Sequence, residues 1–219
     1  PSLVQAIIAG GREAVFRSRE GAEDRRQAAR ADVRRRVRAG DVLVGIAASG
    51  VTPFVAEGLR TAKTRHASTV LITCNAATSS RALADVTIAV PVGPEIITGS
   101  TRLKAGTATK LVLNMLTVAT MVRLGKVHGN RMVDVRPTSR KLHARAARLV
   151  VELGSVSAAQ AARLLRQARG RTKLAIVMAA RRVTLTTARH LLAVHHGQLR
   201  PLVGTLEGGR PKAEGRTQI

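Results

Sequence analysis

The chain has 219 residues, with 37 Lys and Arg against 13 Asp and Glu, so its formal net charge is +24. Apolar residues make up 45% of it, which excludes a wholly disordered basic chain and suffices for a packed core. The single cysteine excludes an internal disulfide and is typical of a cytoplasmic protein. Two Phe and no Trp or Tyr argue against a platform that stacks single-stranded bases.

The positive charge is concentrated near the C-terminus. Residues 136–219 hold 17 of the 37 basic and 3 of the 13 acidic side chains, which is 14 of the 24 net positive charges. This change in composition predicts a domain boundary between residues 135 and 136. No uninterrupted apolar run reaches the roughly 18 residues of a membrane helix, so we expect no membrane association.

The first 135 residues alternate between strand and helix patterns. Continuous apolar, β-branched runs that end at turn residues predict buried strands. A helix is predicted from Pro53, where proline suits the first helical turn, and a short helical link precedes the last strand. The pattern indicates a parallel sheet covered on both faces. The predicted strands are residues 1–9, 42–48, 68–74 and 86–92.

The remaining elements are predicted to be helical. Residues 102–124 have apolar positions on all sides, which favours a largely buried helix. Beyond residue 136 no strand pattern remains, and residues 201–219 are polar enough to predict a disordered tail. The predicted helices of this region lie near 138–153, 157–168, 172–181 and 184–196.

The most distinctive local feature is the loop Ala48-Ser49-Gly50-Val51-Thr52, between a predicted strand and a predicted helix. Ligands of parallel sheets bind at the carboxyl ends of strands, where helix N–H groups favour an anion. Ser49, Gly50 and Thr52 therefore form a candidate phosphate cradle. The alternative is an ordinary strand–helix turn with Ser and Thr as caps. No Walker lysine and no Gly-x-Ser-x-Gly motif is present.

A second candidate site begins the long helix. In Ser100-Thr101-Arg102-Leu103-Lys104, the cations could neutralise a phosphate, and Glu95 is a possible polar partner. The alternative is a capped helix with solvated charges. In the acidic segment around Glu23, the residues alone favour helix-dipole partners over a catalytic base.

Metal and thiol chemistry have little support in the sequence. It has no Cys-x-x-Cys or His-Glu-x-x-His motif, so we expect no metal site. Cys74 follows a predicted strand, where a small, buried structural residue is favoured over a nucleophile.

Several long segments resemble one bacterial family. IAGGREAVFRSREGAED, DVLVGIAASGVTPFV, VGPEIITGSTRLKAGTATKLVLNML and MVRLGKVHGNRMVDV are similar, in this order, to the N-acetylmuramic acid 6-phosphate etherases. The resemblance covers about residues 7–200. It implies a flavodoxin-like, three-layer sugar isomerase (SIS) domain over residues 1–135 and a small helical domain over 136–200.

The family resemblance also implies the chemistry. The expected reaction cleaves the D-lactyl ether of N-acetylmuramic acid 6-phosphate, giving N-acetylglucosamine 6-phosphate and D-lactate. The expected enzyme is a cytoplasmic homodimer of cell-wall recycling without metal or organic cofactor. Glu23 of the GAED motif matches the family's proton-abstracting base. The residues expected to bind the sugar phosphate are Ser49, Gly50, Thr52, Ser100, Thr101 and Lys104.

The sequence departs from the family at Val51 and in the linker RRQAARADVRRRVRAGD (residues 25–41), which is more basic than the family's usual linker. Val51 stands where the family usually has Arg, which removes one cation from the cradle unless Arg102 or Lys104 compensates. The family's second catalytic glutamate belongs to a motif upstream of residue 1. In the strand order 2-1-3-4-5, the central first strand would also precede residue 1. We therefore expect instability, or direct pairing of residues 1–9 with 42–48.

Two other functions remain open at this stage. A non-catalytic, sugar-phosphate-binding regulatory protein would use the same domain without the second glutamate. Nucleic-acid binding is suggested by the charge of +24, but the shortage of aromatic residues and the lack of a helix-turn-helix pattern make it the weaker alternative.

Overall fold

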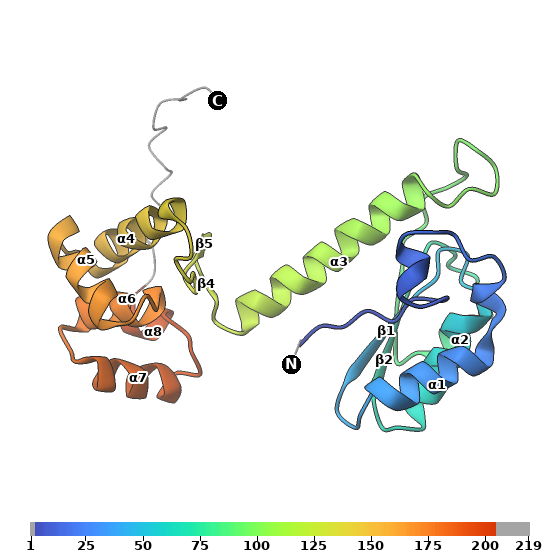
Figure 1. The fold of residues 1–219 in the computed structure, drawn as a ribbon, viewed down its shortest axis with the longest axis horizontal. Coiled ribbons are helices and arrows are strands. Elements are labelled where there is room, and N and C mark those ends of the chain that lie inside the picture. Colours follow the sequence, from blue (N-terminus) through green and yellow to red (C-terminus); the bar gives the residue numbers. More distant parts are fainter. Residues whose placement is uncertain (1–2, 205–219) are drawn as a thin grey trace. The chain divides into compact units, whose positions relative to one another are not determined.

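The computed structural model describes residues 3–204 (Figure 1). The chain divides into two compact units, residues 1–114 and 115–219, and the division falls inside one long helix, α3 (Lys104–Arg123). Each unit has its own cluster of buried apolar side chains.

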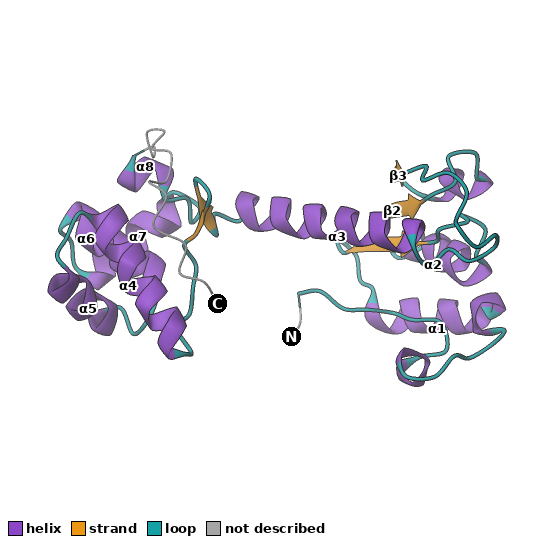
Figure 2. Cartoon of the chain, turned by 90° about the horizontal axis from the view of Figure 1, so that it is seen from above, coloured by secondary structure: helices purple, strands orange, loops and turns teal. Residues whose placement is uncertain are grey.

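The first unit is an α/β unit (Figure 2). Its strands are β1 (Val42–Ile46), β2 (Ser68–Thr73) and β3 (Val86–Ala89), which confirms three of the predicted strands. Its other elements are η1 (Arg12–Val15), η2 (Ala22–Asp24), α1 (Arg26–Arg36), α2 (Pro53–Lys63), η3 (Ser79–Leu83) and the first part of α3.

The three strands form a parallel sheet in the order β1-β2-β3. Gly45 of β1 pairs with Leu71 of β2, and Val70 pairs with Val86 of β3. Because all three strands run the same way, the loops that follow them meet at one edge of the sheet. That edge holds the predicted cradle.

The predicted strand over residues 1–9 is wrong in the described residues 3–9, and residues 1 and 2 lie outside the described part. This segment does not pair with β1, so the expected direct pairing is wrong as well. Its contacts are made with helices instead. Arg36 Nη1 donates to the Ala6 carbonyl at 2.9 Å, and Ile7 packs on the cluster of Val33, Val37, Ala62 and Ala67.

Helix α2 packs on β1 and β2, and α1 packs on α2 (Figure 1). Close packing explains the glycine of β1, because a Cβ at Gly45 would lie 2.8 Å from Val55 and 3.2 Å from Leu59. The opposite face of the sheet is covered only in part, since Val42 and Val86 remain exposed. The expected coverage of both faces is therefore incomplete.

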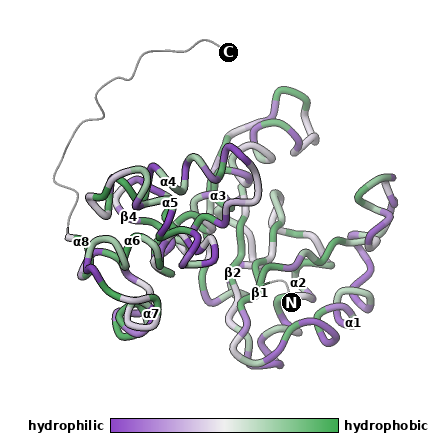
Figure 3. The backbone as a smooth tube through the Cα atoms, turned by 60° about the vertical axis from the view of Figure 1, so that its left-hand side comes forward, coloured by the Kyte–Doolittle hydropathy of each residue, from purple (hydrophilic) through white to green (hydrophobic). Residues whose placement is uncertain are grey.

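Helix α1 lies within the basic linker of residues 25–41, for which the sequence analysis predicted no helix. It is mostly hydrophilic (purple in Figure 3), but Ala29 and Val33, one helical turn apart, are buried. Arg30 Nε donates to the buried Glu57 of α2 at 2.8 Å. Two small apolar contacts and one ion pair thus hold this helix in place.

Helix α3 is present as predicted, but its predicted burial is wrong. Only Ala105 and Val112 are buried among its 20 residues. Large apolar side chains such as Met115 and Val118 are exposed. By length and composition, α3 is the one helix of the described residues that could cross a membrane.

The second unit is helical apart from a small hairpin of β4 (Val127–His128) and β5 (Arg131–Met132). Its core contains fully buried residues such as Val150, Ile176 and Val177. Serine or threonine caps begin three helices, including a capping box between Ser157 and Gln160. The helices are α4 (Arg140–Gly154), α5 (Ala158–Gln167), α6 (Thr172–Arg181), α7 (Leu185–Val194) and α8 (Arg200–Val203).

The compact units differ from the domains expected from charge. Val133 and Val135 belong to the core of the second unit, although both precede residue 136. Charge reflects surface composition rather than packing, so the domain assignment 1–135 and 136–200 stays a prediction. The predicted disordered tail is wrong at residues 201–203, which belong to α8, and residues 205–219 lie outside the described residues.

Candidate active site

The loop from β1 to α2 is shaped by a glycine in the left-handed region. Gly50 has φ +77°, and its N–H donates to the Ala47 carbonyl at 3.0 Å, which closes a tight turn. A Cβ at Gly50 would lie 2.6 Å from the Cβ of Thr78. Two constraints therefore require glycine at position 50: the positive φ and the close approach of the Thr78 side chain.

Two side chains from beyond β2 hold this loop. Asn75 Nδ2 donates to the Ser49 carbonyl at 3.0 Å, and Thr78 Oγ1 donates to the Gly50 carbonyl at 2.8 Å. The Asn75 side chain also accepts from the Ala77 N–H at 3.0 Å, an Asx-type turn. The sequence analysis missed Asn75 and Thr78 as site residues. An Asn-x-x-Thr sequence directly after a buried strand is the signal that could have found them.

With its carbonyls occupied, the loop leaves N–H groups free. The N–H groups of Thr52, Phe54 and Val55 donate no hydrogen bond to any described residue. They stand at the start of α2, where the helix dipole is positive. The exposed Ser49 hydroxyl accepts weakly from the Val51 N–H at 3.4 Å. Such an arrangement suits an anion with several acceptor oxygens.

The segment after β3 reaches the same edge of the sheet through Glu95. The Glu95 carboxylate accepts from the N–H groups of Lys104 and Ala105 at 3.1 and 3.0 Å, so it caps α3. These backbone hydrogen bonds, first that of Ala105, hold the pKa of Glu95 below its usual value. Burial, and then the charge of Glu95, raise the pKa of the Cys74 thiol at the end of β2. Cys74 is half-buried, so its predicted burial is only partial.

The remaining predicted residues of this segment occupy the turn before α3. Lys104 Nζ donates to the Pro94 carbonyl at 2.9 Å, so its charge is tied to this loop. The Ser100 N–H donates to the Ile97 carbonyl at 3.0 Å, and the Thr101 and Arg102 side chains are exposed. No hydrogen bond joins Ser100 or Thr101 to the cradle in the described residues. Their assignment to the sugar phosphate stays a prediction.

Glu23 lies in η2, which packs against α2. The preceding Gly21 adopts the left-handed conformation, and Ala22 is buried, which fixes this short turn on the helix. Glu23 itself is exposed and makes no ion pair with a described residue. Helix α2 therefore contacts η2, which carries Glu23, and also begins at the end of the cradle loop.

Among residues 3–204, neither a cation that compensates for Val51 nor a metal-binding cluster is found at this edge. Val51 is 65% exposed, and no arginine donates to the cradle loop among the described residues. Within residues 3–204, no group of three or more His, Cys, Asp and Glu side chains could hold a metal ion. At this edge the described residues offer backbone N–H donors that suit an anion, and the carboxylate of Glu95.

Replacing Gly50 with Ala tests the cradle geometry. The new Cβ would collide with Thr78 and strain the left-handed backbone, so we expect a loss of about 1–3 kcal/mol in unfolding free energy. We also expect weaker binding of inorganic phosphate. Urea denaturation followed by far-ultraviolet circular dichroism measures the first effect, and the phosphate-induced shifts of the Thr52, Phe54 and Val55 amide NMR signals measure the second. As a control, Gly99→Ala tests a left-handed glycine whose Cβ would have no neighbour within 4 Å. Equal phosphate affinities in both variants would contradict the cradle.

Comparison with known proteins identifies the family to which this chain is similar. Residues 24–119 match the SIS domain family. A protein of Rhodopirellula baltica named N-acetylmuramic acid 6-phosphate etherase is 48% identical over 206 residues, 94% of this chain and 68% of that protein. Proteins with the same name from Symbiobacterium thermophilum and Geobacillus thermodenitrificans are 54% and 47% identical, over 81% and 91% of this chain.

The chain is shorter than these relatives. It spans 68% of the Rhodopirellula protein, 59% of the Symbiobacterium protein and 68% of the Geobacillus protein. The α/β unit with its parallel three-stranded sheet is consistent with the SIS fold.

Proposed function

Because the chain belongs to the N-acetylmuramic acid 6-phosphate etherase family, we propose that its sheet edge binds a sugar phosphate and takes part in cleaving a lactyl ether. The observation that carries this proposal is the cradle at Ser49–Thr52. There, free N–H groups at the start of α2 stand in a loop held by Asn75 and Thr78. The 6-phosphate of the substrate supplies the anion that this arrangement suits.

The proposed reaction is an elimination followed by hydration. In the open-chain sugar, the C1 aldehyde makes the C2 proton acidic, and the Glu23 carboxylate removes it as a general base. The C3–O bond then breaks, D-lactate leaves with a proton from a second acid, and a C2=C3 double bond remains. Water adds its oxygen to C3 and a proton to C2, which gives N-acetylglucosamine 6-phosphate. The second acid corresponds to the family's second glutamate, whose motif is not found in residues 1–219.

Two features of the first unit support a base role for Glu23. It follows a left-handed glycine on a turn packed against α2, so its backbone is anchored to the helix that begins at the cradle. Its carboxylate makes no ion pair with a described residue and is free to accept a proton. Glu95, by contrast, is engaged by two backbone N–H groups and serves as a helix cap.

We also propose that the protein acts in the cytoplasm, in the recycling of cell-wall sugars, as a homodimer. Support for the dimer comes from α3, where Leu111, Met115, Val118 and Val122 are 54%, 63%, 61% and 46% exposed. Their spacing of four, three and four residues places them on one face of the helix. A second copy of this chain would remove this apolar stripe from water.

The base role predicts a selective effect of Glu23→Gln. Without a carboxylate to accept the C2 proton, D-lactate release from N-acetylmuramic acid 6-phosphate should fall about a hundredfold to ten-thousandfold. Binding of N-acetylglucosamine 6-phosphate should persist, because the cradle is intact. The assay uses this chain alone and a chimaera that adds the part of the Rhodopirellula relative outside the match. Glu20→Gln, on the same exposed turn, is the matched control. A folded chimaera without lactate release, or equal turnover in both variants, would refute the proposal.

The dimer predicts a mass change on charging the stripe. Leu111→Glu with Val118→Glu should convert a dimer into a monomer, measured by light scattering after size exclusion, with the helical circular dichroism unchanged. Thr120→Glu adds charge at an exposed position on the opposite face of the same helix and should leave the dimer intact. A monomeric parent chain would contradict the proposed assembly.

A further inference from the structure

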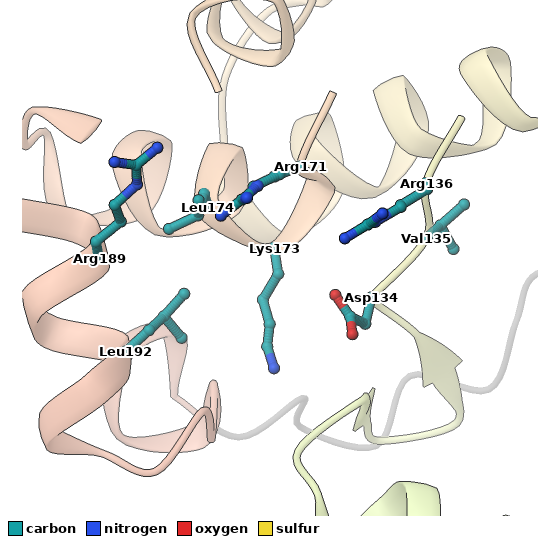
Figure 4. Close-up of a pocket in the computed structure, with 8 residues that line it drawn as sticks. All are labelled: Asp134, Val135, Arg136, Arg171, Lys173, Leu174, Arg189 and Leu192. Atoms are coloured by element: carbon teal, nitrogen blue, oxygen red, sulfur yellow. The ribbon is translucent and has the colours of Figure 1, made fainter. Parts of the chain in front are cut away.

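The second unit contains a pocket that the proposed reaction does not use (Figure 4). Its volume is about 330 Å³, at the lower end of the range typical of small-ligand sites. The segment after β5, the start of α6 and the exposed side of α7 form its walls. Four cationic side chains line it: Arg136, Arg171, Lys173 and Arg189.

The charges of this pocket are not balanced. Asp134 is the only carboxylate that lines it, and its side chain already binds Lys126 at 2.8 Å. Among the described residues, none of the four lining cations makes an ion pair or a side-chain hydrogen bond. Other arginines do form ion pairs: Arg131 pairs with Glu152, and Arg30 pairs with Glu57.

The cations are held in place by buried structure. Thr172 is 1% exposed, and its Oγ1 donates to the Val135 carbonyl at 2.7 Å. This bond ties the start of α6 to the segment before Arg136, so the backbone positions of Arg136, Arg171 and Lys173 lie close to one another. Lys173 is half-buried, and burial lowers the pKa of its ammonium group. Keeping these charges close together is unfavourable unless an anion joins them.

The backbone adds further donors. Helix α6 has no side-chain cap at its N-terminus, and the N–H groups of Thr172, Lys173 and Leu174 donate to no described residue. Leu174 and Leu192 form an apolar wall on one side of the cavity. The pocket therefore combines arginine guanidinium groups, N–H groups at the start of α6 that donate to no described residue, and a small apolar surface.

We propose that this pocket binds a small phosphorylated metabolite, with the phosphate held by Arg136, Arg171, Lys173 and Arg189 and the body of the molecule against Leu174 and Leu192. Arginine forks can contact a phosphate with two parallel hydrogen bonds, and Lys173 adds a further positive charge to the lining of the pocket. A concave site with an apolar wall favours a small molecule over a nucleic-acid backbone, which needs an open basic surface.

The proposal concerns residues of the second unit alone and stands whether or not the sheet edge is catalytic. Inorganic phosphate and glucose 6-phosphate are the probes, added to the full chain in low salt. Calorimetry measures the affinity, and the amide NMR signals of Thr172 and Leu192 report binding in this pocket. The Gly50→Ala variant, which alters the cradle, should keep these amide shifts.

The decisive variant is Lys173→Met with Arg189→Gln, which removes two charges and keeps the side-chain length at position 173. We expect phosphate affinity at the pocket to fall about tenfold or more, because two charge-assisted contacts are lost. The matched control is Lys141→Met with Arg163→Gln, two exposed cations of the same unit that do not line the pocket. If the double variant does not fold, Arg189→Gln alone applies, since Arg189 is exposed.

Three results would overturn the proposal. Unchanged phosphate affinity in the pocket variant would show that these cations are merely solvated. An equal loss in the control variant would show diffuse attraction to a basic surface. Displacement of phosphate by a short duplex DNA, with affinity falling steeply as salt rises, would identify a nucleic-acid surface instead.

Discussion

The chemistry of the first unit depends on one backbone turn, in which Gly50 is pressed against Thr78. The positive φ of Gly50 turns the chain from β1 into α2, and the Thr78 hydroxyl binds its carbonyl at 2.8 Å. Asn75 fixes the preceding carbonyl from the same side. With these acceptors occupied, the N–H groups that begin α2 remain available to an anion. The parallel sheet supplies the frame, because it brings the ends of β1 and β2 to one edge.

The cradle relies on backbone donors rather than on cations. Val51 offers no charge, and Lys104 is tied to the Pro94 carbonyl. Phosphate recognition by N–H groups and a helix dipole is geometrically specific but weaker than recognition by an arginine fork. The second unit has the opposite character, since a pocket beside the start of α6 is lined by four cations that make no ion pair with any described residue. The high net charge of the chain thus includes a local site as well as solvated surface charge.

The sequence predicts the elements whose signal is local. The strands at 42–48, 68–74 and 86–92 are continuous apolar runs, and the cradle follows from a strand, a Ser-Gly pair and a Pro at the next helix start. Residues 3–9 have an equally apolar composition but no strand beside them to pair with, and Ile7 packs on α1 instead. Composition could not reveal that difference, because pairing is a non-local property.

The exposure of α3 and the two proposed anion sites could not be predicted from the sequence for the same reason, because they also depend on non-local packing. The apolar residues of α3 predict a buried helix, yet composition does not say what would cover it. Asn75 and Thr78 are 26 and 28 residues from the carbonyls that they bind, and the four pocket cations span residues 136–189. Each becomes visible only when the fold brings distant segments together. The role proposed for Glu23 comes from a family motif, since its local sequence alone favours a helix-dipole partner.

Amide hydrogen exchange at the β1–α2 loop tests the central claim most directly. With N-acetylglucosamine 6-phosphate bound, the N–H groups of Thr52, Phe54 and Val55 should exchange more slowly, because phosphate oxygens accept their hydrogen bonds. Unphosphorylated N-acetylglucosamine should leave their exchange unchanged. Equal exchange at these three amides with and without the sugar phosphate, under conditions in which the ligand binds, would contradict the cradle and the function built on it.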